Sequence, residues 1–285
     1  MKVSLILATV GRTTDVGRCL RSLATQTDTN FEVLLVDQNQ DDRLLPFVRE
    51  AASWAYTIKH LRMAQPSLSG ARNLGIAHAS GEIIGLTDDD CWYENDAIAQ
   101  LRAAFLDDDE LDGVVGHWVE QSQAREHGQA TGQLSLAAWR RFRGGDASSI
   151  TLFFKKDLLI KLGGFDERFG IGQWFGAGEE TDFVLRALTH KARLVNLPGV
   201  RVHHHFNTAH IPITPASCRN ARRRARGTGA IYAKHKLSAK VIARGLLAPV
   251  AVPLFQGNLT AACLGVFVVF GRLEGFIRWN LWRLR

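Results

Sequence analysis

The sequence predicts an α/β fold, in which a mostly parallel sheet is flanked by helices. Short apolar runs alternate with helix-like segments through about residue 105, and each run has the length of a strand. The first run (3–8), an amphipathic helix and the second run (31–36) follow one another closely, as in a βαβ unit with a right-handed crossover. No G-x-G-x-x-G follows the first run, which argues against a dehydrogenase-type dinucleotide fold.

The elements follow in order along the chain. Thr13 or Thr14 is expected to cap the first helix, whose apolar residues recur at helical spacing. Further strands are expected at residues 56–61, 83–86, 113–119, 148–154, 192–195 and 200–205. Further helices are expected at residues 70–79, 95–105, 158–162 and 179–188. The polar stretch 120–145 is expected to be irregular and to lie over the site.

Three adjacent acids follow one of these strands. The apolar run 83–86 ends in Asp88, Asp89 and Asp90, and ligands of open α/β sheets bind beyond the carboxyl ends of strands. Carboxylates so close repel one another unless a cation lies among them. Mg²⁺ and Mn²⁺ prefer oxygen ligands, often carboxylates together with substrate phosphates. The triplet therefore predicts a metal and phosphate site, with a solvated acidic loop as the alternative.

Composition limits the class of protein. The 285 residues are 46% hydrophobic and 22% charged, which allows a real core and excludes global disorder. Four scattered cysteines without a metal-binding spacing suit a reducing compartment. The N-terminus resembles a first strand more than a secretory signal. These features predict a cytoplasmic catalytic part.

The C-terminal third differs in character from the rest. The net charge of +7 gathers there, in a basic run from 222 to 244 that precedes the uncharged stretch 245–271. That stretch is long enough to cross a bilayer, but prolines and polar residues interrupt it and basic residues flank both ends. We expect an interfacial pair of helices or a re-entrant hairpin at a membrane surface, and a buried helical hairpin is the alternative.

Seven short stretches, taken together and in order, resemble the family 2 glycosyltransferases. They are residues 4–9, 22–27, 31–37, 71–75, 88–90, 163–167 and 178–182. The resemblance covers roughly residues 1–205 and implies a GT-A fold and an inverting enzyme that uses nucleotide-diphosphate sugars. It implies a catalytic domain at 1–215, with a nucleotide-sugar half (1–119) and an acceptor half (120–215), followed by a helical extension at 216–285.

The resemblance also implies roles for individual residues. Thr9, Arg12, Asp37, Arg72, Asp88 and Asp89 would bind the nucleotide sugar. Asp90 would hold Mn²⁺ or Mg²⁺, with His205 or His203 as a further ligand, because alternation in a strand turns these two to one face and His204 to the other. Asp146, Trp174 and Asp182 would contact the acceptor.

The general base is expected at a pair of acids that opens a helix. The family pair usually ends in Asp, whereas this chain has Glu179 and Glu180. Glu180 occupies the base position, and the substitution leaves open whether Glu179 acts instead. A carboxylate there would take the proton of the acceptor hydroxyl.

The expected function is therefore transfer of a sugar, from a UDP-sugar by family frequency, to a glycan or lipid-linked oligosaccharide at the inner face of the cell membrane. A non-catalytic sugar-nucleotide or carbohydrate-binding scaffold is the main alternative. A processive synthase is disfavoured because no Gln-x-x-Arg-Trp motif is present. No nucleic-acid partner is expected, and the sequence does not predict the oligomeric state.

Overall fold

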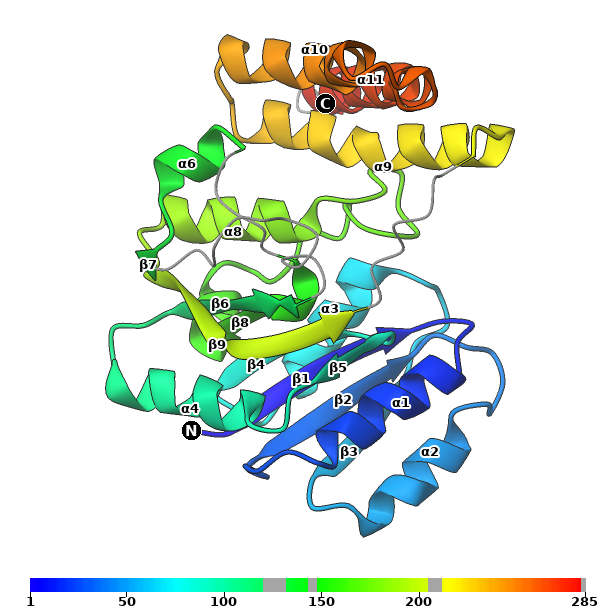
Figure 1. The fold of residues 1–285 in the computed structure, drawn as a ribbon. Helices are drawn as coiled ribbons and strands as arrows, with labels where there is room; N and C mark the ends of the chain where they lie inside the picture. The colour runs from blue at the N-terminus through cyan, green and yellow to red at the C-terminus, as the bar shows by residue number, and fades with distance from the viewer. Residues whose placement is uncertain (120–131, 143–147, 205–211, 283–285) are drawn as a thin grey trace.

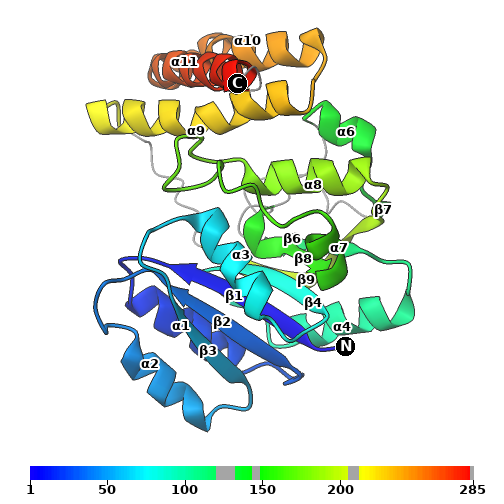
Figure 2. The ribbon, with the colours of Figure 1, turned by 180° about the vertical axis from the view of Figure 1, so that it is seen from behind.

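The computed structural model describes residues 1–119, 132–142, 148–204 and 212–282. Figure 1 shows a sheet with helices on both faces and a separate layer of C-terminal helices on one side of it; Figure 2 shows the same layers from behind. The strands are β1 (Val3–Thr9), β2 (Phe31–Asp37), β3 (Thr57–Arg62), β4 (Ile83–Asp88), β5 (Cys91–Tyr93), β6 (Gly113–Trp118), β7 (Gly132–Gln133), β8 (Leu152–Lys155) and β9 (Leu194–His204). The helices are α1 (Thr14–Leu23), α2 (Leu45–Glu50), α3 (Leu68–His78), α4 (Ala97–Asp107), α6 (Leu136–Arg140), α7 (Lys156–Lys161), α8 (Glu179–Thr189), α9 (Pro215–Lys234), α10 (Ala239–Phe255) and α11 (Leu259–Trp282).

The sheet is mixed, and its strand order is β3-β2-β1-β4-β8-β6-β9-β5, with β7 paired to β9. Strands β1 to β4 are all parallel, and Ala8 of β1 lies beside Asp88 of β4. Strand β8 is antiparallel to both β4 and β6, whereas β6 and β9 are parallel. The carboxyl ends of β1 and β4 therefore meet at one edge, which is where the site lies.

Period-two alternation divides the core between the two faces of the sheet. Leu5 and Leu7 pack with α1 and α4, while Ile6 packs on the other face with α3, α7 and α8. The buried stripe predicted for the first helix is present, but its N-cap Thr13 makes no side-chain capping hydrogen bond.

The C-terminal layer shares the core of the sheet domain. Ile231 of α9 and Trp279 of α11 belong to the same buried cluster as Ile6 and Phe183. Helices α9 and α11 pack so closely that a Cβ on Gly271 or Gly275 would meet the backbone of α9.

The elements differ from the prediction in a few places. The two short strands expected at 192–195 and 200–205 form the single long strand β9. A three-residue strand, β5, directly follows the acid triplet, and α6 and β7 lie within the stretch expected to be irregular.

Candidate active site

A cavity of about 570 Å³ lies at the carboxyl edge of the sheet. The ends of β1, β4 and β9, the start of α8, the loop 170–178 and Arg224 of α9 all contribute to its wall. Gly178 has a φ of 101°, and this left-handed turn directs the first residues of α8 toward the cavity. Acidic groups from β4 and from α8 thus face one space.

The acid triplet is held by neighbouring donors. Thr9 Oγ1 donates to Asp89 Oδ2 at 2.6 Å, and Arg12 Nη1 lies 3.1 Å from Asp89 Oδ1 and also pairs with Asp90. His204 Nε2 lies 3.0 Å from Asp90 Oδ1. Burial raises the pKa of Asp89 to about 6, although Thr9 and Arg12 oppose the shift. Burial also acts on Asp90, but hydrogen bonds from His204 and Arg12 outweigh it and lower the pKa of Asp90.

Arg72 connects the triplet to the acids of α8. It is 3% exposed, and its guanidinium lies 3.1 Å from Glu179 Oε1, 3.5 Å from Glu180 Oε1 and 3.6 Å from Asp88 Oδ1. Three acidic side chains surround this buried cation, compensate its desolvation and fix its position between the two halves of the site.

Glu179 and Glu180 differ in exposure. The side chain of Glu180 is 24% exposed, that of Glu179 only 4%, and both residues line the cavity. Glu179 Oε2 is buried without a hydrogen-bond partner among the described residues. Burial and then the charge of Glu180 raise the pKa of Glu179, although Arg72 acts in the opposite direction. Glu179 is therefore the buried acid of the pair, with a raised pKa, while Glu180 has more contact with the cavity.

Asp90 and His204 are the described side chains in this cavity that could hold a divalent cation, if their present contacts gave way to it. No group of three or more His, Cys, Asp or Glu side chains in the described ranges has the geometry of a metal site. Asp90 and His204 supply one carboxylate and one imidazole 3.0 Å apart, and two cationic groups, Arg12 and His204, already hold the Asp90 carboxylate. Ions such as Mn²⁺ and Mg²⁺ commonly combine so few protein ligands with substrate phosphates and water.

Residues 4–162 match the family described as glycosyl transferase family 2. This chain belongs to glycosyl transferase family 2. Among curated members, it is 33% identical over 120 residues to the putative glycosyltransferase EpsH of Bacillus subtilis, covering 42% of this chain and 34% of EpsH. It is 28% identical over 117 residues to glycosyltransferase GlyA of Streptococcus pneumoniae, covering 41% of this chain and 17% of GlyA. The matches thus span 34% and 17% of the length of these relatives.

Solved structures confirm the GT-A fold class for this family 2 member. A mannosyltransferase from Pyrobaculum calidifontis, in complex with GDP-Man and Mn²⁺, superposes with a TM-score of 0.66 at 16% identity, covering 100% of this chain and 88% of that one. Residues 1–349 of TarS from S. aureus superpose with a TM-score of 0.59 at 18% identity, covering 100% and 92%.

Seven of the fourteen site residues predicted from the sequence meet in the cavity of this glycosyltransferase family member. They are Thr9, Arg12, Asp88, Asp89, Asp90, Glu179 and Glu180. Asp37 and Arg72 are not among the residues that line it. Asp37 is fully buried behind the wall and accepts hydrogen bonds from Asn39 and His60, while its neighbour Gln38 reaches the cavity. Contact of Asp37 and Arg72 with the nucleotide therefore stays a prediction, and both residues lie behind the groups that line the cavity.

Of the predicted histidine ligands, the structure describes only His203. His203 turns away from the triplet, stacks on Trp92 and lies 3.0 Å from Glu94 Oε1, whereas His204 faces Asp90. The sequence predicted that neighbouring histidines of β9 lie on opposite faces of the strand. It could not predict which face points to Asp90, because the pairing of β9 with its neighbouring strands is not visible in the sequence. His205 lies outside the described residues, as does Asp146.

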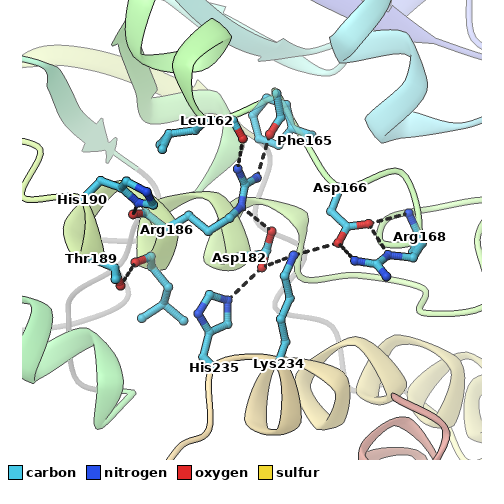
Figure 3. Close-up of polar contacts among 12 residues, drawn as sticks. Leu162, Phe165, Asp166, Arg168, Asp182, Arg186, Thr189, His190, Lys234 and His235 are labelled. Atoms are coloured by element: carbon cyan, nitrogen blue, oxygen red, sulfur yellow. Dashed lines mark hydrogen bonds and ion pairs between the residues drawn. The ribbon is translucent and has the colours of Figure 1, made fainter. Parts of the chain in front are cut away.

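Two further residues, Asp182 and Trp174, were predicted to contact the acceptor, and neither lines this cavity. Asp182 is completely buried, and its carboxylate oxygens lie 2.7 Å from Lys234 Nζ, 2.8 Å from His235 Nε2 and 3.0 Å from Arg186 Nε (Figure 3). It clamps α8 to α9 and does not reach the cavity. Trp174 also lies outside this cavity and lines a second one.

Sequence reasoning missed Arg224 and Trp118, which line the cavity beside His204. Arg224 lies in the basic run 222–244, which was predicted to face a membrane surface. The packing of α9 over the site brings Arg224 to the cavity. No local signal distinguishes it from its exposed neighbours.

Proposed function

We propose that this chain is an inverting, metal-dependent glycosyltransferase that moves a sugar from a nucleotide diphosphate to a hydroxyl of a glycan or lipid-linked oligosaccharide. The observation that supports it most is the pairing, across one cavity, of the acid triplet with the acids of α8, joined by Arg72. The triplet side suits a diphosphate and the α8 side suits an acceptor hydroxyl.

Glu180 is the general base of the proposed reaction. Its carboxylate takes the proton of the acceptor hydroxyl while the hydroxyl oxygen bonds to the anomeric carbon. The bond from that carbon to the diphosphate breaks on the opposite face, and the nucleoside diphosphate leaves with the bonding electrons. Protonated Glu179 adds no second negative charge beside Glu180, and Arg72 holds the Glu180 carboxylate in place.

The departing diphosphate gains negative charge, which cations at the other side of the cavity stabilise. Arg12 and Arg224 both line the cavity and are the arginines available for this role. A divalent cation held by Asp90 and His204 would supply further electrostatic stabilisation of the leaving group. The Pyrobaculum calidifontis relative, in complex with GDP-Man and Mn²⁺, supports this proposal by analogy of fold.

The proposed location is the cytoplasmic face of the membrane. Helix α11 is the one described helix long and apolar enough to cross a bilayer, and 22% of its most apolar window is buried. Apolar side chains at the turn between α10 and α11 are exposed, with Phe255 at 92% and Leu259 at 73%. An exposed apolar edge flanked by arginines suits a helix pair lying in the membrane interface.

Nucleotide release from a panel of sugar nucleotides, measured with and without Mn²⁺, tests the proposed function. The expected result is metal-dependent release from one donor or a few related donors. Binding of sugar nucleotides, seen as a thermal shift, without any release in the presence of acceptor extracts would instead favour the non-catalytic scaffold.

A further inference from the structure

A second cavity, of about 500 Å³, lies between the loop 170–178 and the C-terminal end of α11. Its lining combines two cations with aromatic and apolar groups and contains no acid. The lining residues are Arg168, Gln173, Trp174, Phe175, Arg278, Leu281 and Trp282.

Aromatic rings hold both arginines of this cavity in place. The Arg278 guanidinium lies 4.2 Å from the centroid of Trp174, and Arg226 lies 4.5 Å from that ring. Arg168 lies 4.3 Å from Trp279 and 4.5 Å from Trp282. Such stacking keeps a guanidinium oriented while its N–H groups remain able to bind an anion.

The two arginines differ in their acidic partners. Arg168 pairs with Asp166, whereas no carboxylate within the described ranges lies within 4.0 Å of Arg278. Among the described residues, Arg278 is thus the arginine of this cavity whose positive charge no carboxylate within 4.0 Å balances. An anion is the complementary ligand, and a phosphate oxygen matches the guanidinium geometry.

The cavity opens onto an apolar surface. Leu281 and Trp282 line it and remain 59% and 48% exposed, and Ile277, 54% exposed, lies one turn earlier on α11. The ligand that fits this combination has an anionic head for the cavity and a hydrocarbon chain for the α11 surface.

One loop separates this cavity from the proposed active site. Its residues Ile171, Gly172, Gly176 and Ala177 line the active-site cavity, while Gln173, Trp174 and Phe175 between them line the second one. A head group bound at Arg278 thus lies across a single loop from Glu180.

We propose that this second cavity, called here the Arg–Trp cavity, binds the phosphate of a lipid-linked acceptor. The acceptor is then a sugar or another hydroxyl-bearing group that is carried on a lipid phosphate. The hydrocarbon chain of that lipid lies along α11. The role of this ligand as the acceptor rests on the proposed function. The binding of a lipid phosphate in the Arg–Trp cavity does not depend on that function.

Vesicle cosedimentation of the full chain tests the site. Phosphatidylcholine vesicles are compared with the same vesicles carrying polyprenyl phosphate, and inorganic phosphate is added as a competitor. We expect stronger binding to the polyprenyl phosphate vesicles, and no displacement by inorganic phosphate at the concentration of the lipid phosphate. Equal binding to both vesicles, or displacement by inorganic phosphate, would overturn the proposal.

Arg278→Gln is the informative variant, and Lys240→Gln is its matched control. Lys240 is exposed on α10 in the same C-terminal layer and lines neither cavity. A general basic surface contributes about 1 kcal/mol per residue, or roughly fivefold in binding, for either lysine or arginine. We expect Lys240→Gln to lose no more than that, and Arg278→Gln to lose over tenfold, only on vesicles with polyprenyl phosphate. Equal losses in the two variants would contradict a specific site.

Donor binding separates this inference from the proposed reaction. Arg278→Gln is expected to bind sugar nucleotides in the presence of Mn²⁺ as the parent chain does, because Arg278 does not line the active-site cavity. A parent chain without nucleotide release would contradict the proposed reaction, whereas unchanged vesicle binding by Arg278→Gln would contradict the lipid site.

Discussion

At the scale of single residues, the difference between Glu179 and Glu180 follows from burial. Both acids open the same helix, where the helix dipole favours a negative charge, and both lie near Arg72. Only Glu180 presents its carboxylate to the cavity to an appreciable extent.

Glu179→Gln is expected to change the pH dependence of stability. Because the folded-state pKa of Glu179 is raised above 4.5, the folded chain keeps a proton that the unfolded chain releases. The stabilising contribution of that proton is fully present below pH 4.5 and is lost as the pH rises through the folded-state pKa. The free energy of unfolding of the parent, minus that of Glu179→Gln, should therefore fall between pH 5 and pH 8 in urea titrations, at pH values spaced about one unit apart. A constant difference would contradict a buried, protonated Glu179.

His204→Ala is expected to weaken Mn²⁺-dependent binding of the donor nucleotide by about tenfold or more, because it removes one of two proposed metal ligands. His203→Ala, one position away on the opposite face of β9, is the control and should bind as the parent does. Isothermal titration with the nucleotide and Mn²⁺ measures both. The opposite ranking would restore His203 as the ligand.

At the scale of elements, the clamp between α8 and α9 fixes where the acids of α8 point. Asp182 on α8 meets Lys234 and His235 at the end of α9, and Lys234 also reaches Asp166 at 2.7 Å (Figure 3). Burial opposes ionisation of Asp182, but His235, Lys234 and Arg186 outweigh it and lower its pKa.

Asp182→Asn should lower the free energy of unfolding by about 3 kcal/mol, because it leaves buried cationic groups without their partner. Urea denaturation measures this loss, and the KM for the acceptor should change little in the remaining folded enzyme. A rise in that KM without a loss of stability would return Asp182 to the acceptor-binding role that the family resemblance implied.

The sequence predicted the parallel half of the sheet well, because strands such as 31–36 are continuous apolar runs bounded by polar residues. It predicted the triplet at the end of β4 for the same reason. It did not predict β5, since three residues carry no usable period, or the continuity of β9 across Pro198 and Gly199. Whether Asp37, Arg72 and Asp182 line the active-site cavity or lie behind its lining depends on tertiary packing. The sequence alone does not reveal that packing.

At the scale of the whole molecule, the C-terminal layer completes the core and the site. Trp279 of α11 lies 5.4 Å from Phe169 and 5.6 Å from Phe175, ring centroid to centroid, and Arg224 of α9 lines the active-site cavity. From their basic and apolar composition, residues 216–285 were predicted to be an extension of the catalytic domain. Composition alone does not reveal that one face of these helices is buried against that domain.

Trp279→Ala is therefore expected to destabilise the entire chain, by about 4 kcal/mol, because it opens a cavity in the shared core. Unfolding followed by tryptophan fluorescence and by far-UV circular dichroism should shift together as one transition. Two separate transitions, with only one of them shifted, would indicate that the C-terminal helices unfold on their own.

Turnover by Glu180→Gln is the sharpest test of whether Glu180 is the base of the sugar transfer. With the donor identified by the nucleotide panel, transfer should fall by about a thousandfold while donor binding stays at the parental level. Glu179→Gln, measured beside it, should keep most of its turnover, because its side chain already carries a proton at neutral pH. Near-normal transfer by Glu180→Gln, or loss of transfer in Glu179→Gln alone, would contradict the account.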